Sequence, residues 1–95
     1  MLPGDGFEWD EAKSAANLLK HGLDFATACR VFEGPVAERK DERRDYGEDR
    51  FQAIGLVQGR VLVVVYTWRG ARRRLISARK AREDERAVFR RSLGD

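Results

Sequence analysis

Clustered arginines are the first feature of this sequence that could do chemistry. Residues 69–91 contain ten Arg and Lys against three Asp and Glu, a local charge of about +7. A phosphate backbone favours such a cluster, because bound Lys and Arg release condensed counterions and Arg grips a phosphate with two parallel hydrogen bonds. The cluster therefore indicates a nucleic-acid partner. A solvated Arg-rich surface is the open alternative.

Metal-free cleavage of RNA by internal attack needs three groups. A base takes the proton from the ribose 2′-OH, cations stabilise the charge on the phosphoryl oxygens, and an acid protonates the departing 5′-oxygen. Imidazole titrates near neutral pH, so His21, the only histidine, could be the base or the acid. Favourable placement at the end of a helix is the rival account of His21.

Five side chains form the predicted catalytic set: His21, Arg50, Arg69, Arg79 and Lys80. Arg79 is the predicted phosphate clamp, with Lys80 beside it at the end of the last strand. Arg50 and Arg69 stand at strand ends that antiparallel pairing could bring to the same side of a sheet. Arg50 could instead simply pair with Glu48.

The predicted RNA-binding set is Lys13, Lys20, Tyr66, Trp68, Arg72 and Arg74. Lys13, Lys20, Asn17 and His21 recur on one face of the predicted first helix, which could equally be a solvated face. Tyr66 and Trp68 could stack on bases. Their strand parity also suits core packing, which stays open.

Metal ligands are scarce in this chain. With one Cys and one His, it offers no Cys/His cluster for zinc, so neither a metal nor a cofactor is predicted. Cys29 lies on an apolar helix stripe and is predicted to be a small buried residue rather than a nucleophile.

Length and composition predict one folded domain over residues 1–95. Charged residues make up 37% of the chain and hydrophobic residues 42%, which is typical of a folded protein with a charged surface. The longest apolar run, 61–66, is too short to span a bilayer, and the acidic start, 1–13, lacks the order of a secretory signal. We expect a cytoplasmic protein.

The N-terminal part predicts a short strand and two helices. The strand covers 7–9, and the first helix covers 11–21, capped by Asp10 and ended by Gly22. Ala12, Ala16 and Leu19 are expected to face the core from this helix. A second helix follows Asp24 and ends at 33–35.

The remainder predicts a sheet and a closing helix. A short strand at 36–39 leads into an exposed loop or ragged hairpin. Runs at 50–57, 60–68 and 72–79, separated by tight turns, predict an antiparallel meander whose middle strand is covered on both faces. A helix at 81–93 closes the chain. The fold class is therefore α+β, with helices packed on the sheet.

Three segments, "FEWDEAKSAANLLKHGLDFATACRVFEGP", "YGEDRFQAIGLVQGRVLVVVYTWRG" and "RLISARKAREDER", resemble the BrnT family of type II toxin–antitoxin toxins. The resemblance runs from about residue 7 to residue 86. Phe89 departs from it, since relatives often carry Tyr there. The resemblance implies a RelE-like fold and a metal-independent endoribonuclease that stops translation and growth.

The resemblance also implies partners. These are an RNA substrate and a cognate BrnA-like antitoxin with a ribbon-helix-helix DNA-binding domain, in complexes of two toxins and two antitoxins. DNA would be bound only through the antitoxin, and no membrane is involved. The alternative function is a non-catalytic basic module that binds RNA or a partner protein through the same face. A third possibility is a toxin that serves mainly to dock the antitoxin in a DNA-bound repressor.

Overall fold

A five-stranded sheet forms the centre of the computed structural model, which describes residues 6–94. In the order β1-β5-β4-β3-β2, the strands are β1 (Phe7–Glu8), β5 (Arg72–Lys80), β4 (Arg60–Arg69), β3 (Phe51–Val57) and β2 (Val36–Lys40). β1 runs parallel to β5, and the other pairs are antiparallel. Residues 1–5 and 95 of the predicted domain, and so the first part of segment 1–13, lie outside the described residues.

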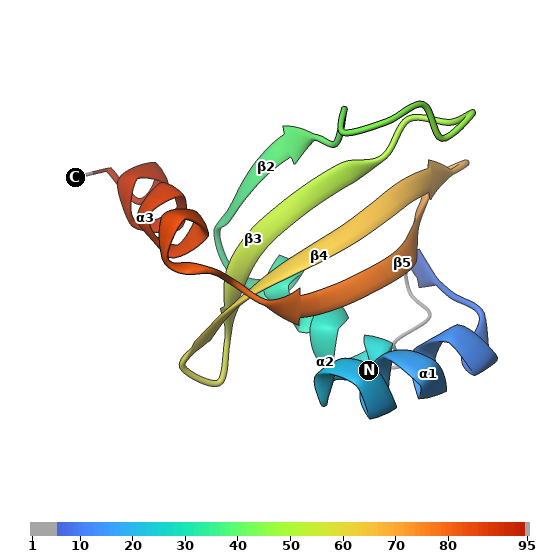
Figure 1. Cartoon of the computed structure of the whole chain (residues 1–95). Coiled ribbons are helices and arrows are strands. Elements are labelled where there is room, and N and C mark those ends of the chain that lie inside the picture. The colour runs from blue at the N-terminus through green and yellow to red at the C-terminus, as the bar shows by residue number, and fades with distance from the viewer. Residues whose placement is uncertain (1–5, 95) are drawn as a thin grey trace.

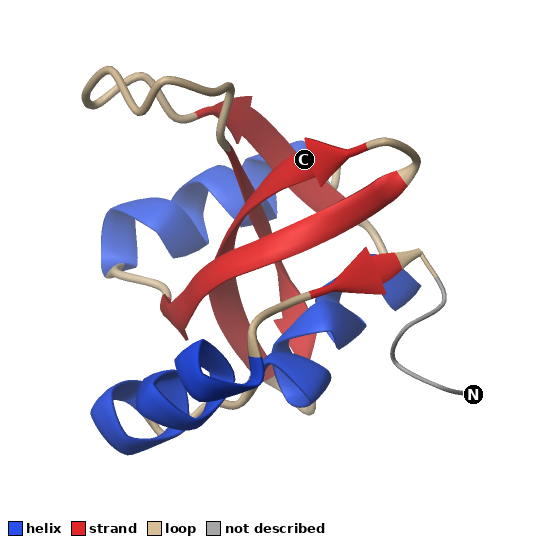
Figure 2. Cartoon of the chain, turned by 90° about the vertical axis from the view of Figure 1, so that its right-hand side faces the viewer, coloured by secondary structure: helices blue, strands red, loops and turns tan. Residues whose placement is uncertain are grey.

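The helices pack on both sides of the sheet (Figure 1). On one side lie α1 (Glu11–His21), α2 (Phe25–Ala28) and the 3-10 helix η1 (Cys29–Glu33). On the other side, α3 (Glu83–Ser92) covers one end of the sheet (Figure 2). This arrangement confirms the predicted α+β class and antiparallel meander. Among residues 6–94, no helix is long and apolar enough to span a membrane.

Two apolar clusters hold these layers together. The larger lies under α2 and η1 and includes Phe25, Val31, Leu62, Val64 and Leu75. The smaller lies under α3 and consists of Ile54, Val63, Ala81 and Phe89. β4 contributes to both clusters because alternate side chains point to opposite sides. It is therefore the central strand, covered on both faces, that its apolar run predicts.

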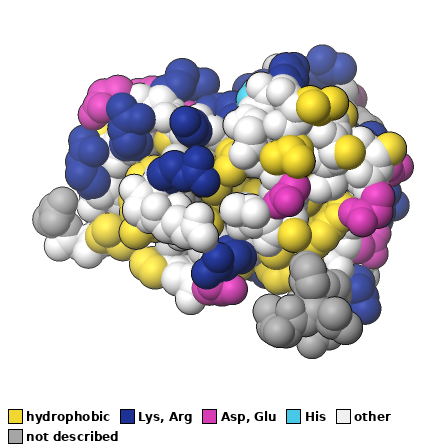
Figure 3. Space-filling model, turned by 90° about the horizontal axis from the view of Figure 1, so that it is seen from below, with side chains coloured by type: hydrophobic (Ala, Val, Ile, Leu, Met, Phe, Trp, Pro, Cys, Tyr) yellow, Lys and Arg dark blue, Asp and Glu magenta, His cyan; other side chains and the backbone are white. Residues whose placement is uncertain are grey.

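The first helix packs on the sheet through polar groups. Ala12, Ala16 and Leu19 are exposed, and Leu19 is 89% exposed, so the predicted core face is wrong. Ser14 and Asn17 are buried instead. The molecule viewed from below in Figure 3 shows apolar side chains at several separate places and Lys and Arg gathered at the α3 end.

Backbone hydrogen bonding explains this orientation of α1. Asn17 Nδ2 donates to the carbonyls of Leu23 at 2.7 Å and Ala78 at 2.9 Å, and its Oδ1 accepts from Ala78 N at 3.2 Å. Ser14 Oγ accepts from Phe25 N at 2.9 Å. These buried backbone groups need partners, and that need overrides the weak apolar pattern of the helix.

Candidate nucleic-acid interface

Strand register places several arginines on the α3 side of the sheet. Val63 packs under α3 and pairs with Arg79 in β5, so both side chains point to that side. Thr67 and Arg69 follow Val63 by four and six positions along β4, so they share its side. They pair with Arg74 and Arg72, respectively. Arg69 belongs to the same row. The α3 side therefore carries cations along the length of β4 and β5.

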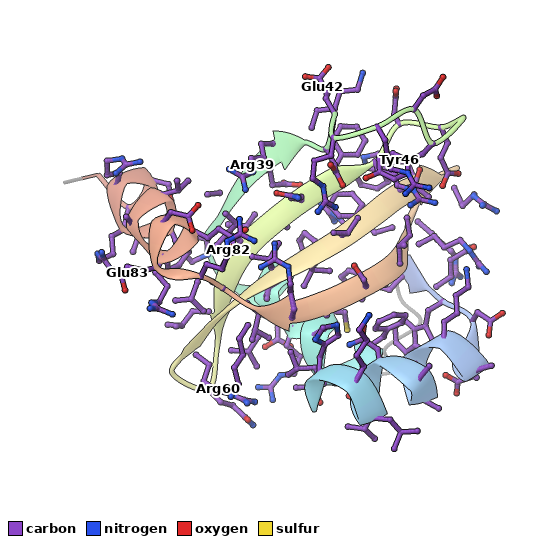
Figure 4. The ribbon with its side chains drawn as sticks, viewed as in Figure 1. Arg39, Glu42, Tyr46, Arg60, Arg82 and Glu83 are labelled. Carbon is purple, nitrogen blue, oxygen red and sulfur yellow. The ribbon has the colours of Figure 1, made fainter. Side chains whose placement is uncertain are left out.

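Three arginines meet around one carboxylate at the α3 end of this side. Arg79 binds Glu85 with both Nη atoms, at 2.7 and 2.8 Å. Arg82 Nη2 lies 3.1 Å, and Arg39 Nη2 3.6 Å, from Glu85 Oε2. Arg39 comes from β2 and Arg82 from the segment before α3, and Figure 4 shows both residues beside the start of that helix, between it and the sheet.

Glu85 lies at the bottom of this cluster. It is 1% exposed and also accepts a hydrogen bond from the backbone N–H of Arg82 at 2.8 Å, which fixes the first turn of α3. The hydrogen bonds from Arg79 outweigh burial and lower the pKa of Glu85 to about 2. The same bonds raise the pKa of Arg79. The carboxylate is therefore ionised at neutral pH.

A hollow of about 130 Å³ opens beside the cluster. Five Arg and Lys, three Asp and Glu, and Gln52 line it, which leaves an excess of two positive charges. Asp41, also buried, binds Arg43 through two contacts of 2.7 Å, and these hydrogen bonds lower its pKa. This pair anchors the segment between β2 and β3, predicted as an exposed loop or a ragged hairpin, at the rim of the hollow.

Arg50 and Arg69 lie at the other end of the sheet. Antiparallel pairing brings both to Glu48, at 3.2 Å from Arg50 and 3.7 Å from Arg69. The pairing of Arg50 with Glu48, left open by the sequence, is thus present. Arg69 lies six positions along β4 from Val63, the partner of Arg79, a distance of about 20 Å. The predicted catalytic side chains do not form one compact site.

Lys80 and His21 lie on the side of the sheet opposite Arg79. Lys80 pairs with Leu62, a member of the cluster under α2, so it points away from α3. His21 follows Asn17 by one helical turn, and Asn17 contacts the backbone of Ala78, which places His21 at the same sheet end as Lys80. Lys13 and Lys20 are exposed on α1.

The two predicted stacking rings differ in access. Tyr66 is 2% exposed, packs against Phe32 and donates its hydroxyl to Glu38; burial raises its pKa. Trp68 is 45% exposed. Arg73, which sequence reasoning missed, places its guanidinium 4.6 Å from the Trp68 ring and 4.2 Å from the Phe32 ring. Trp68 is therefore the ring that could stack on a base.

The two remaining predicted RNA-binding arginines contact β1. Arg72 Nη1 donates to the Phe7 carbonyl at 3.2 Å, and Arg74 Nη1 donates to Glu8 at 2.9 Å.

Cys29 is buried, as predicted, and burial raises the pKa of its thiol. Across residues 6–94, no group of three or more His, Cys, Asp or Glu is arranged to hold a metal ion.

The fold and the site define a small mixed α+β protein with a cationic sheet side that suits a polyanion. The sequence model of one protein family, described as the ribonuclease toxin BrnT of type II toxin–antitoxin systems, matches residues 9–85. The chain belongs to this family. Membership implies an RNA target and an antitoxin partner. A comparison with curated proteins gave no significant match.

Proposed function

We propose that this chain is a metal-independent endoribonuclease that cuts RNA by internal attack of the ribose 2′-OH and thereby inhibits translation and growth in the cytoplasm. The observation that carries the proposal is the convergence of Arg39, Arg79 and Arg82 at one hollow on the α3 side of the sheet. Paired guanidinium groups suit the charge that builds on phosphoryl oxygens during cleavage.

The row of arginines on the α3 side of the sheet suggests the path of the RNA. A single RNA strand would run along the α3 side of β4 and β5, with phosphates over the arginines that register places there. Trp68 lies on the opposite side with Tyr66 and Arg73, so it would stack on a base that passes around the Arg69 end of β4. His21 and Lys80 lie on the opposite side of the sheet, so they would take part in proton transfer where the RNA passes over the edge of β5 beside Arg79. Arg50, Arg69, Arg72 and Arg74, with Lys13 and Lys20, would bind flanking phosphates.

The proposed fold type and mode of neutralisation are supported by the element order and by the family. The element order of one domain, with a five-stranded sheet flanked by α1 and α3, supports a RelE-like fold. We propose that a ribbon-helix-helix antitoxin neutralises the toxin in a complex of two toxins and two antitoxins, and that DNA is bound only through the antitoxin. Family membership supports this assignment.

The test is incubation of the purified, partner-free protein with labelled RNA in excess EDTA. We expect discrete fragments from the wild type and none from Arg79→Ala, because that variant loses the two hydrogen bonds that fix the clamp. A His21→Ala sample reports on proton transfer. Arg60→Ala is the matched control, since Arg60 is exposed at the β3–β4 turn, outside the hollow (Figure 4).

Circular dichroism must accompany each sample, because Arg79→Ala removes one partner of a buried carboxylate and is expected to cost stability. Intact RNA that the wild type binds and releases with salt would support the non-catalytic binding module instead. Full activity of a folded Arg79→Ala protein would remove Arg79 from the mechanism.

A further inference from the structure

The carboxylate of Glu85 connects three segments that are distant in sequence. It joins Arg39 of β2, Arg79 of β5 and Arg82 at the start of α3. Arg39 is fixed a second time, since its Nε donates to Gln52 Oε1 at 2.7 Å. One buried side chain therefore determines where three guanidinium groups lie.

The arginines remain open to solvent above this carboxylate. The side chain of Arg39 is 47% exposed and that of Arg82 is 62% exposed, whereas Glu85 is 1% exposed. A phosphate can thus reach the outer N–H groups of the arginines but cannot reach Glu85. The carboxylate reduces the repulsion among the three cations and still leaves an excess of two positive charges for a ligand.

From this geometry we infer that Glu85 is a positioning residue, which holds Arg39, Arg79 and Arg82 as one receptor for the phosphodiester group that is cut. The inference rests on the proposed ribonuclease function. Glu85 acts through the arginines, because it lies beneath them and its oxygens are occupied by their N–H groups. A displacement of about 1 Å in such a receptor is enough to slow a reaction on the order of 100-fold.

The experiment compares Glu85→Gln with Glu83→Gln. Both variants remove one negative charge from the first turn of α3, but Glu83 is exposed and, among the described residues, pairs with Arg86 and Arg90 of its own helix rather than with the arginines at the hollow. We measure the single-turnover rate of RNA cleavage and, separately, the affinity for RNA. For Glu85→Gln we expect the cleavage rate to fall on the order of 100-fold while affinity for RNA is retained. Glu83→Gln should match the wild type.

Inorganic pyrophosphate gives a second readout that does not need cleavage. We expect pyrophosphate to raise the melting temperature of the wild type and of Glu83→Gln, but not that of Glu85→Gln. If Glu85→Gln fails to fold, Glu85→Asp decides, because it keeps the charge but is too short to hold all three arginines. Glu85→Asp should then show the same two losses.

The outcomes separate this inference from the function on which it rests. If Glu85→Gln, or Glu85→Asp in its place, cleaves RNA and responds to pyrophosphate as Glu83→Gln does, Glu85 has no positioning role. If the wild type cuts no RNA but its response to pyrophosphate depends on Glu85, the proposed function fails, while the assembly of the anion receptor by Glu85 stands.

Discussion

Glu85 shows how one residue can have two roles that the sequence does not separate. It stands in an acidic first turn with Glu83 and Asp84, where all three carboxylates suit the positive end of the helix dipole. Only Glu85 is buried and bound to Arg79. Its position three residues after Arg82, where a carboxylate can bond back to the residue before the helix, is the one signal that distinguishes it.

The lowered pKa of Glu85 predicts a loss of stability in acid. Its value of about 2, against the ordinary 4.5, means that the ion pair stabilises the fold above about pH 4.5 and is lost as the pH falls from there towards 2. The contribution is about 3 kcal/mol at neutral pH. Urea unfolding of the wild type and of Glu85→Gln from pH 6 to pH 2.5 measures it.

In that comparison the wild type should lose more stability than Glu85→Gln as the pH falls through this window. Asp41, whose pKa is also lowered, is present in both proteins and cancels in the difference. Curves that stay parallel across the whole range would mean that Glu85 is not tightly paired in the folded protein.

At the scale of elements, α1 shows why an apolar pattern can mislead. The helix begins and ends where Asp10 and Gly22 predict, because caps are local features. Which face packs on the sheet depends on the carbonyl of Ala78, a residue of β5 sixty-one positions away from Asn17. Sequence spacing alone carries no information about that distant partner.

The docking of α1 predicts a large effect for one alanine substitution and almost none for another. Asn17→Ala leaves buried backbone groups of Leu23 and Ala78 without partners and should lower the free energy of unfolding by about 3 kcal/mol. Leu19→Ala should change it by less than about 0.5 kcal/mol, because Leu19 is exposed. Denaturant unfolding checks both. A large loss for Leu19→Ala with none for Asn17→Ala would restore the apolar face as the packing surface.

At the scale of the whole molecule, the sequence predicted the fold better than the site. Turn residues, caps and the apolar run of β4 act locally, so most helices and strands lie within about two residues of their predicted ends. The predicted second helix is the exception, since α2 ends at Ala28 and the 3-10 helix η1 continues to Glu33. The site depends on which strands are neighbours and in what register. That register brings Arg50 and Arg69 together at Glu48 but places Arg79 far from them.

Dependence on strand order also explains why the sequence did not identify Arg39 and Glu85 as site residues. Arg39 belongs to the edge strand β2 and Glu85 to a helix, and the two meet because α3 packs against the end of the sheet that contains β2. Arg79 could be predicted as a site residue because its local sequence, "ISARKA", lies in a segment that resembles the family. Its partners have to be read from the folded protein.

The most direct test of the central claim is to map where RNA binds. Arginine side-chain and backbone NMR signals would be followed during titration with a short RNA carrying 2′-fluoro riboses, which cannot attack its own phosphates. We predict the largest changes at Arg39, Gln52, Arg79 and Arg82, around the hollow on the α3 side. Changes confined to Arg50, Trp68 and Arg69, or to the exposed lysines of α1, would contradict the placement of the RNA site at that hollow.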